Sequence, residues 1–443
     1  MDRIAQNGAG GNLPTAEIAR DLEGFLEPVL RRLPEERLRR VCALLVRGIV
    51  AGQSPLITVI ARSLERDEAS AWPLARRGYR FLWNQRFSHW ELLKGMGAVA
   101  QRTVARYAPK KLVIAIDPVN LEKPYTWKLQ GVSRVLKSTP PGPKGEKRIT
   151  SGYPAITATV VNLPEPAIPY ARWFSYQTED FTSENRELER ALRVCHVLFR
   201  GRKCRYVGDA GLDDQKVFRG IDRLGDEFVI RVSHEERLVE VYNERLKRWE
   251  REPLLSFVET VPFTCRWKVL FTHAHTARWA NIALGWFRIR LPGDAEHSYW
   301  VLVAHDTGLH RNLVLITNVA IEGEEIAREV YADWRCRSYV EHSYRFDQER
   351  GVNVEDISVH TLERMRRLFL LVLLATLFVY HLGQTWSPLQ VQWLLHLGGK
   401  LDLPLDADGP YLFLAGIRAV LITAATLTFA AHHPFPRDRT TYG

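Results

Sequence analysis

The chain has few cysteines, and their spacing excludes the usual metal and disulfide frameworks. Five cysteines are scattered through the sequence, and no two of them form a CxxC pair. This odd, dispersed set does not match a zinc-finger or zinc-ribbon spacing and is typical of reduced thiols in a cytoplasm. The first twenty residues also lack the apolar core of a secretory signal. We therefore expect a cytoplasmic protein.

Long hydrophobic runs are also scarce. The run at 368–380 is shorter than the roughly 20 residues that a membrane-spanning helix needs. The run at 411–431 is long enough, but it contains Arg418 and Gly416, which are unfavourable in a lipid-facing helix. We interpret both runs as core or interface helices and expect no membrane association. A membrane-surface protein that uses residues 368–431 is the alternative.

Acidic residues are outnumbered by basic ones. The sequence has 61 Lys and Arg against 51 Asp and Glu, a net charge of +10 and a pI of about 9.4. Such an excess favours a polyanionic partner, either nucleic acid or an acidic membrane surface. Because 46% of the residues are hydrophobic, the chain is expected to fold into two or three domains with sizeable cores.

Residues 1–105 have the apolar spacing of helices and many arginines. Ser54 and Pro55 precede an apolar-periodic segment as a helix cap and first helical residue would, and a second helix is expected from about Ser70 to Trp83. Two short helices joined by a tight turn are typical of a helix-turn-helix. We predict a helical DNA-binding domain.

From Lys110 the pattern changes to that of an α/β domain. Strands are expected at 110–117, 154–162, 171–177, 204–209 and 227–233, with a helix at 183–201. Two of these strands end in an aspartate, Asp117 and Asp209. Ligands gather at the carboxyl ends of strands in such sheets, and Mg²⁺ prefers carboxylate oxygens. The two aspartates are thus candidate metal ligands, although either one alone would more often be a helix or turn cap, and the loop AGLDDQ favours that interpretation for Asp209.

A basic segment separates the first two strands. Residues 121–150 contain Lys137, Lys144, Lys147 and Arg148, and the PPGP run at 140–143 disfavours regular structure. We expect a loop that is either solvated or in contact with phosphates.

The remaining chain alternates strands with one polar helix. Residues 234–310 contain only strand-like pieces, which predicts a β-rich insertion, and LVLITNV at 313–319 is expected to return to the sheet. A helix then begins near residue 322 and is expected to carry Arg337, Glu341 and Arg345 on one face. The alternative to a functional site is an ordinary Arg337–Glu341 ion pair on the surface of this helix.

This order of motifs resembles the DDE transposases of bacterial insertion sequences. It is similar to the subgroup with the signature Tyr-x2-Arg-x3-Glu-x6-Lys. Trp334, Arg337, Glu341 and Gln348 occupy these four positions, so the spacing matches and two residue types, Trp334 and Gln348, depart from the signature. The resemblance covers about residues 110–385.

The resemblance implies a ribonuclease-H-like catalytic core interrupted by a β-rich insertion, with helical N-terminal and C-terminal regions. The expected boundaries are 1–105 for the DNA-binding domain, 106–233 and 311–385 for the core, 234–310 for the insertion and 386–443 for a helical end. Three carboxylates, Asp117, Asp209 and Glu341, would hold two Mg²⁺ ions, with Mn²⁺ able to replace them.

The resemblance also implies a homodimer on double-stranded DNA, which cuts and joins the terminal inverted repeats of its own element in a prokaryotic cytoplasm, at the nucleoid. The expected DNA contacts are Trp334, Arg337, Arg345, Gln348, Arg231, Lys137, Lys144, Lys147 and Arg148. Arg345 could supply the cation that Gln348 lacks. Two alternatives are a domesticated protein that binds DNA without cleaving it and a ribonuclease-H-like nuclease without strand transfer.

Overall fold

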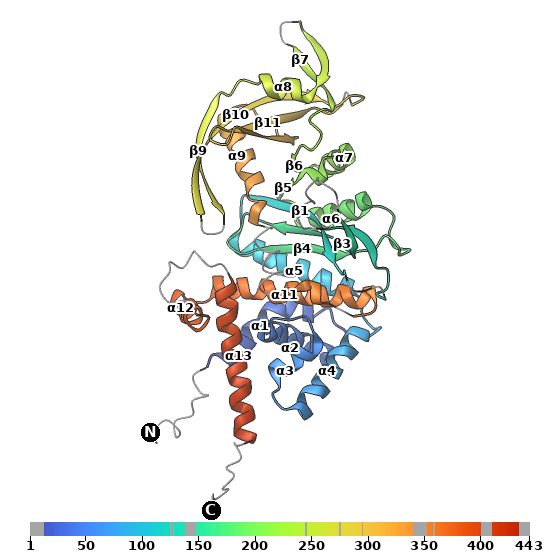
Figure 1. Ribbon diagram of the computed structural model, residues 1–443, viewed down its shortest axis with the longest axis vertical. Coiled ribbons are helices and arrows are strands. Elements are labelled where there is room, and N and C mark those ends of the chain that lie inside the picture. Colours follow the sequence, from blue (N-terminus) through green and yellow to red (C-terminus); the bar gives the residue numbers. More distant parts are fainter. Residues whose placement is uncertain are drawn as a thin grey trace, which may run out of the picture. The chain divides into compact units, whose positions relative to one another are not determined.

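The computed structural model describes residues 13–124, 126, 128–137, 148–243, 246–273, 276–294, 296–339, 352–357, 359–399 and 410–433 (Figure 1). The chain divides into two compact units. Unit 1 comprises residues 1–100, 121–153 and 343–443, and unit 2 comprises residues 101–120 and 154–342. The helical regions at the two ends of the sequence thus belong to one unit.

Unit 1 is built from helices that pack around α11. Its helices are α1 (Thr15–Leu30), α2 (Glu36–Gly52), α3 (Ile57–Leu64), α4 (Glu68–Trp83), the first part of α5 (His89–Tyr107), α11 (Leu362–Thr385), α12 (Pro388–Leu397) and α13 (Pro410–His432). Helices α3 and α4 pack on each other and on α2. Helix α3 begins two residues after Pro55, and the Leu56 N–H bonds the Ser54 hydroxyl at 3.2 Å.

Two helices among the described residues, α11 and α13, are long and apolar enough to cross a membrane by length and composition. The apolar window of α11 is 72% buried inside the protein. Its Arg367 is buried and donates hydrogen bonds to the carbonyl of Leu82, in the last turn of α4, and to those of Asn84 and Phe87, which follow this helix. These bonds satisfy carbonyls that the end of a helix leaves without partners. Helix α11 is therefore a core helix. The window of α13 is 33% buried.

The strands form a 12-stranded mixed sheet, and every strand except β2 lies wholly or partly in unit 2. The order of its first part is β4–β3–β1–β5–β6. The middle strands β1 (Lys111–Glu122), β5 (Lys203–Gly208) and β6 (Glu227–Arg231) run parallel, while β3 (Ile149–Val160) and β4 (Ala167–Trp173) are antiparallel to each other. All five strands overlap the predicted ones, but β4 begins and ends four residues before the predicted range of 171–177.

The β-rich insertion continues the same sheet. Its elements are β7 (Leu238–Asn243), β8 (Arg248–Pro253), α8 (Leu254–Thr260), β9 (Cys265–His273), β10 (Thr276–Arg290) and β11 (Tyr299–Asp306). The returning strand β12 (Arg311–Thr317) pairs antiparallel with both β6 and β11. The expectation that no helix occurs in this segment is wrong, because α8 is present. Seven residues are too few for a helical period to be visible in the sequence.

The basic segment at 121–150 contains regular structure, contrary to the prediction. Strand β1 continues to Glu122, and β2 (Ser133–Leu136) forms an antiparallel pair with β3. The Lys137 N–H bonds the Arg148 carbonyl at 2.9 Å, so these two residues extend the ladder. Lys144 and Lys147 lie outside the described residues. The sequence does not predict β2, because an alternation of four residues is too short to identify a strand.

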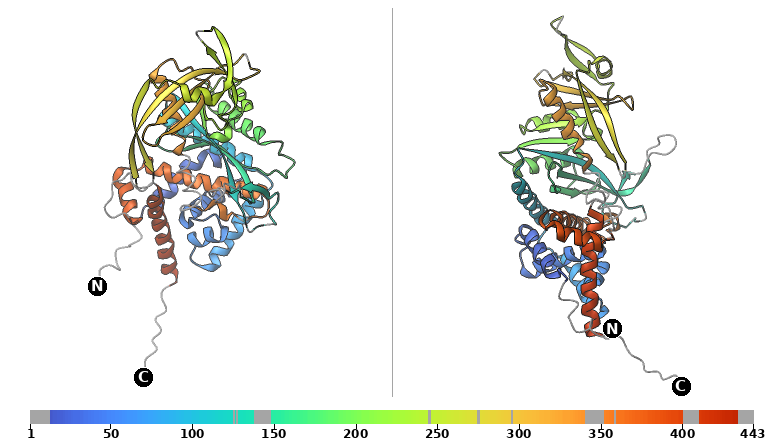
Figure 2. Two further views of the ribbon diagram at one scale, coloured as in Figure 1. Left: turned by 45° about the horizontal axis from the view of Figure 1, so that its top comes forward. Right: turned by 90° about the vertical axis from the view of Figure 1, so that its left-hand side faces the viewer.

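Helices cover both faces of the parallel strands in unit 2 (Figures 1 and 2). Helices α6 (Glu184–Leu198) and α7 (Gln215–Asp222) lie on one face, where the Tyr206 hydroxyl donates to the Leu192 carbonyl and Phe218 stacks on Phe228. Helix α9 (Glu324–Arg335) packs on β5 and β6 from the other face. Successive residues of a strand point to opposite faces, so Arg205, next to Tyr206, faces α9.

Candidate active site

Asp117 and Asp209 occupy equivalent positions on two neighbouring parallel strands. The pairing of β1 with β5 runs from Lys111 opposite Lys203, a difference of 92, to Ala115 opposite Val207. Each aspartate comes two residues after this last pair, and 209 − 117 is again 92. Neighbouring strands lie about 4.8 Å apart, and residues two apart share a face. The register therefore assigns the two carboxylates to adjacent positions on one face.

Arg231 continues this row on the third parallel strand. Strand β5 pairs with β6 from Arg205 opposite Glu227 to Gly208 opposite Ile230, a difference of 22. The same difference sets Asp209 opposite Arg231, the exposed last residue of β6. Two carboxylates and one guanidinium thus follow one another across β1, β5 and β6, level with the carboxyl ends of β5 and β6. The prediction that the first strand ends in Asp117 is wrong, because β1 continues to Glu122.

The turn after β5 orients Asp209. Its Oδ1 accepts a hydrogen bond from the Gly211 N–H at 2.9 Å, which caps the short helix Ala210–Leu212. The turn is tight, because a Cβ on Gly208 would lie 2.3 Å from a methyl carbon of Leu212. A larger residue at position 208 would therefore require the Leu212 side chain to move. Asp209 is therefore a turn cap, as the alternative interpretation held, and its Oδ2 faces the second group of candidate residues.

That second group is the pair of signature residues at the end of α9. The Trp334 indole N–H donates to the Gly208 carbonyl at 3.0 Å, and a guanidinium nitrogen of Arg337 lies 3.5 Å from Asp209 Oδ2. Both contacts fall on the last two residues of the strand end. Trp334, which differs from the tyrosine of the signature, thus has its polar atom bonded to the backbone beside Asp209.

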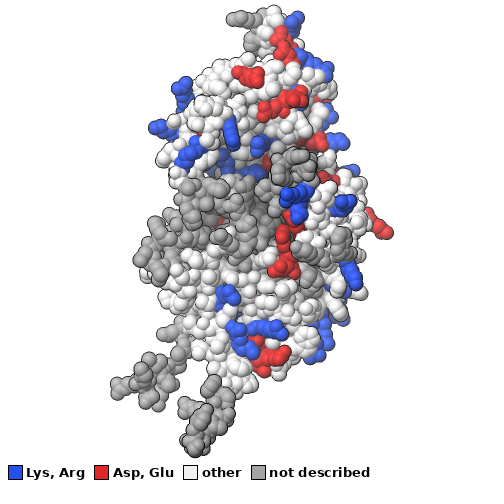
Figure 3. All heavy atoms as spheres, in the orientation of Figure 1, with Lys and Arg blue, Asp and Glu red and all other residues white. Residues whose placement is uncertain are grey.

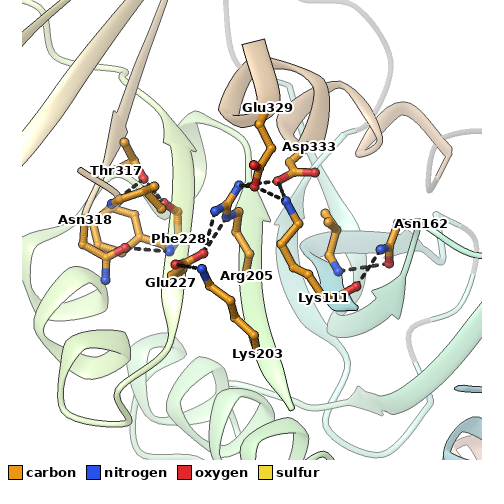
Figure 4. Close-up of polar contacts among 12 residues, drawn as sticks. Lys111, Asn162, Lys203, Arg205, Glu227, Phe228, Thr317, Asn318, Glu329 and Asp333 are labelled. Atoms are coloured by element: carbon orange, nitrogen blue, oxygen red, sulfur yellow. Dashed lines mark hydrogen bonds and ion pairs between the residues drawn. The ribbon is translucent and has the colours of Figure 1, made fainter. Parts of the chain in front are cut away.

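A cluster of ion pairs between the strands and α9 explains why these side chains meet (Figure 4). Arg205, 1% exposed, donates to Glu227 at 2.8 Å and Glu329 at 2.9 Å, and it also contacts Asp333. Lys111 reaches both Glu329 and Asp333 at 2.5 Å. Arg205 therefore connects β5 both to β6 and to α9.

The cluster balances its charges. Its three cations are Lys111, Lys203 and Arg205, and its three anions are Glu227, Glu329 and Asp333. Burial of the Arg205 guanidinium opposes its charge, but the neighbouring Glu227 and Asp333 carboxylates raise its pKa above the ordinary value. A buried network of this kind is costly to disrupt, because each remaining charge loses its partner. It fixes α9 above the strands that carry the aspartates.

These six residues were not recognised in the sequence. Two weak signals existed: Glu329 and Asp333 are four residues apart and so share a helix face, and Arg205 interrupts an apolar strand. A charge inside a strand that is buried on both faces requires a partner, although the sequence does not show which one.

The LITN motif has a structural role. The Thr317 hydroxyl donates to the Phe228 carbonyl at 2.5 Å, and the Asn318 side chain accepts from the Phe228 N–H at 2.9 Å while donating to Asp222 and the Asp226 carbonyl. The motif thus connects the beginning of β6 with the end of β12. Asp209 is level with the other end of β6, so the motif does not contact it.

Helix α9 ends earlier than the sequence suggests. Its last residue is Arg335, and the Arg337 N–H bonds the Trp334 carbonyl, three residues back, in a turn. The prediction of an unbroken helix face that includes Arg337 is therefore wrong, since Arg337 reaches Asp209 from a turn. Glu341, Arg345 and Gln348 lie outside the described residues, and their assignments stay predictions.

Among the described residues, no group of three or more His, Cys, Asp and Glu side chains is close enough to hold a metal ion. Asp117 and Asp209 supply two carboxylates of the hard-oxygen type that Mg²⁺ prefers. This donor set fits a divalent cation and requires at least one further ligand from the chain or from a substrate.

Comparison with known proteins gives a distant similarity to solved structures. No family model matches the sequence, and no curated protein matches it. Among solved structures, the chain is similar to a cryo-electron microscopy structure of the piggyBac transposase synaptic complex with hairpin DNA. The alignment covers 96% of this chain and 81% of that chain, with a TM-score of 0.38 and 8% identity. The functional argument rests on the site itself.

Proposed function

We propose that this protein is a DNA transposase that cuts and joins the ends of its own insertion sequence, with Asp117, Asp209 and Glu341 as its catalytic carboxylates. The observation that carries the proposal is the equal register of Asp117 and Asp209 on β1 and β5, with Arg337 beside Asp209. Glu341 follows Arg337 by four residues, the spacing of the transposase signature.

The strand order supports a ribonuclease-H-like core. Such a core begins with three consecutive strands in a meander, which are followed by two strands parallel to the first. The first strand lies at the centre of the whole five-stranded sheet. The order β4–β3–β1–β5–β6, with β1, β5 and β6 parallel, fits this description. On this fold the first strand carries one catalytic aspartate and the end of the fourth carries another, which are the places of Asp117 and Asp209.

Two Mg²⁺ ions, when bound, would activate the attacking water or 3′-hydroxyl and stabilise the leaving oxygen of a phosphodiester. Asp117, Asp209 and Glu341 would hold these ions. Arg337 lies next to Asp209 and has a planar fork of donors suited to a phosphate. It would orient both the carboxylate and the scissile group.

The partner would be double-stranded DNA, bound as a homodimer at the terminal inverted repeats and at the target. The excess of positive charge and the three packed helices α2, α3 and α4 support a DNA-binding role for the N-terminal region. Arg231, at the end of the aspartate row, would contact the substrate backbone.

The test uses a duplex with the DNA that flanks the reading frame. Wild-type protein with Mg²⁺ should nick this duplex and join its 3′ end to a plasmid, whereas Asp117→Asn and Asp209→Asn should bind the duplex without nicking it. Asp214→Asn is the matched control, since this half-buried residue caps α7 and accepts a hydrogen bond from Asn185, and asparagine keeps an oxygen for the cap. Nicking without joining would favour the nuclease, and binding without either would favour the domesticated protein.

A further inference from the structure

Helix α4 in unit 1 has two distinct faces. The residues of its buried face are Ala71, Leu74, Ala75, Gly78, Phe81 and Leu82. Four exposed side chains, Trp72, Arg76, Arg80 and Trp83, follow one another at spacings of four, four and three residues. Such spacings bring side chains to one side of a helix. One face of α4 therefore packs into unit 1, while the other presents two arginines and two tryptophans to solvent.

Both tryptophans of this face lie largely in water. Trp72 is 52% exposed and Trp83 is 57% exposed. Tryptophan is highly buried on average, and exposed rings that lie near each other are typical of an interaction site. The core of unit 1 does not account for these two rings, because it takes the opposite face of α4.

Positive charge dominates the segment that carries this face. Residues 69–90 include four arginines and no Asp or Glu. Arg76 and Arg80 have no carboxylate partner within the described part of the chain. Asp67 and Glu68 lie at the beginning of α4, where Asp67 caps the helix. Figure 3 shows Lys and Arg side chains over the region of α3 and α4, with acidic side chains gathered at one place. The face is therefore cationic beyond its first turn.

Helix α3 adds a third arginine to this face. Arg62 lines a groove between α3 and α4 together with Trp72 and Arg76. Glu68 lines the same groove from the first turn of α4. Arg62 is exposed and forms no ion pair with a carboxylate of the described residues. The cationic face of α4 thus continues onto α3.

Helix α11 contributes to the other end of the face. The Arg364 guanidinium lies over the Trp83 ring, 4.6 Å from its centroid, in a cation–π contact. The neighbouring Glu363 bonds His89 and Arg367 instead, so it does not neutralise Arg364. Helices α4 and α11 come from the N-terminal and C-terminal regions of the sequence, and both lie in unit 1. The face is therefore not a property of the N-terminal region alone.

We propose that these residues form a binding surface for duplex DNA, the α4 surface, which consists of Arg62, Trp72, Arg76, Arg80, Trp83 and Arg364. Its arginines contact the phosphate backbone, because cations without a carboxylate partner gain affinity by releasing the counterions of DNA. Its tryptophans offer flat apolar rings to the deoxyribose groups between these phosphates. The inference rests on the proposed function, names the residues that hold its DNA and adds α11 to the N-terminal helices.

The experiment measures binding of the full chain to a fluorescent duplex by anisotropy over a range of salt concentrations. The duplex carries the DNA that flanks the reading frame, and EDTA prevents cleavage. The test variant is Arg76→Gln/Arg80→Gln. The matched control is Arg186→Gln/Arg193→Gln on α6, which changes the charge equally but removes arginines that are already paired with Glu189.

Loss of two phosphate contacts should reduce the slope of log affinity against log salt by about 1.8 and weaken binding at 0.1 M salt by about ten-fold or more. The control should keep the wild-type slope. An equal reduction in the control would overturn the α4 surface, because net charge alone would then explain the effect. If the double variant does not fold, Arg80→Gln alone should reduce the slope by about 0.9.

Arg364→Gln tests the contribution of α11 and should also reduce the slope by about 0.9. An unchanged slope in this variant would overturn the assignment of α11 to the surface. Wild-type slopes in both Arg76→Gln/Arg80→Gln and Arg364→Gln would overturn the whole surface, as expected if an acidic protein segment is its partner, and would leave the carboxylate assignment intact. A wild-type protein that binds no duplex at any salt concentration would overturn both proposals.

Discussion

Replacement of Arg205 by methionine tests whether the buried ion pairs hold α9 in place. Arg205 is 1% exposed, and its guanidinium contacts the carboxylates of Glu227, Glu329 and Asp333. Methionine has a similar length but no charge, so the variant removes the ion pairs while it largely preserves the packing. The balanced cluster of three cations and three anions would then carry a net charge of −1.

Removal of one partner from a buried ion pair costs about 3–5 kcal/mol. We expect the lower end, about 3 kcal/mol, because Lys111 and Lys203 remain close to the three carboxylates and Glu329 is 47% exposed. For a domain of this size, each kcal/mol lowers the melting temperature by about 2–4 °C. The expected loss for unit 2 is therefore about 6–12 °C.

Thermal unfolding followed by circular dichroism at pH 7 measures this loss. Arg186→Met is the control, because this arginine is 64% exposed and its ion pair with Glu189 is worth less than about 1 kcal/mol. Adding Asp333→Asn to Arg205→Met should recover part of the stability, since it removes the net negative charge that the cluster gains when Arg205 is lost. A melting temperature of Arg205→Met within about 1 °C of the wild type would refute the reasoning.

Three further predictions concern single side chains. Burial lowers the pKa of Lys123 to about 8, below the value of about 10.4 of an unfolded lysine. The folded chain thus loses this proton first, and the urea midpoint of the wild type should rise relative to that of Lys123→Met between about pH 8 and 10; parallel curves would contradict this. Trp334→Phe should cost about 1–2 kcal/mol and slow nicking more than it weakens binding, because the Gly208 carbonyl loses its donor; unchanged melting and nicking would exclude this role. In single-turnover nicking, Arg345→Ala should cost about 1–2 kcal/mol more than Gln348→Ala, since only Arg345 carries charge; equal rates would leave that cation unassigned.

The strands that carry the aspartates could be found from the sequence, whereas the end of β1 and the register of the two strands could not. Asp117 follows an apolar run rich in valine and isoleucine, a local pattern that identifies the strand, but β1 continues past it to Glu122. Asp209 directly follows the last residue of β5, as predicted. Asp117 and Asp209 are opposite each other because of the residue at which β1 and β5 begin to pair. This is a tertiary property, set by contacts between segments about ninety residues apart.

Short elements and long-range ion pairs were the other features that the sequence could not predict. Strand β2 and helix α8 contain too few residues for a visible period. The end of α9 at Arg335 has no proline or glycine to signal it. The partners of Arg205 come from another strand and from a helix more than a hundred residues away, so no sequence window contains them.

The most direct test of the central claim is Mn²⁺ binding, followed by electron paramagnetic resonance of the free ion. If Asp117 on β1 and Asp209 at the end of β5 hold a divalent cation, the wild type should bind Mn²⁺, and Asp117→Asn and Asp209→Asn should each weaken its affinity at least about ten-fold. Asp214→Asn should bind as the wild type does. Equal Mn²⁺ affinity in all four proteins would contradict the assignment of Asp117 and Asp209 as metal ligands.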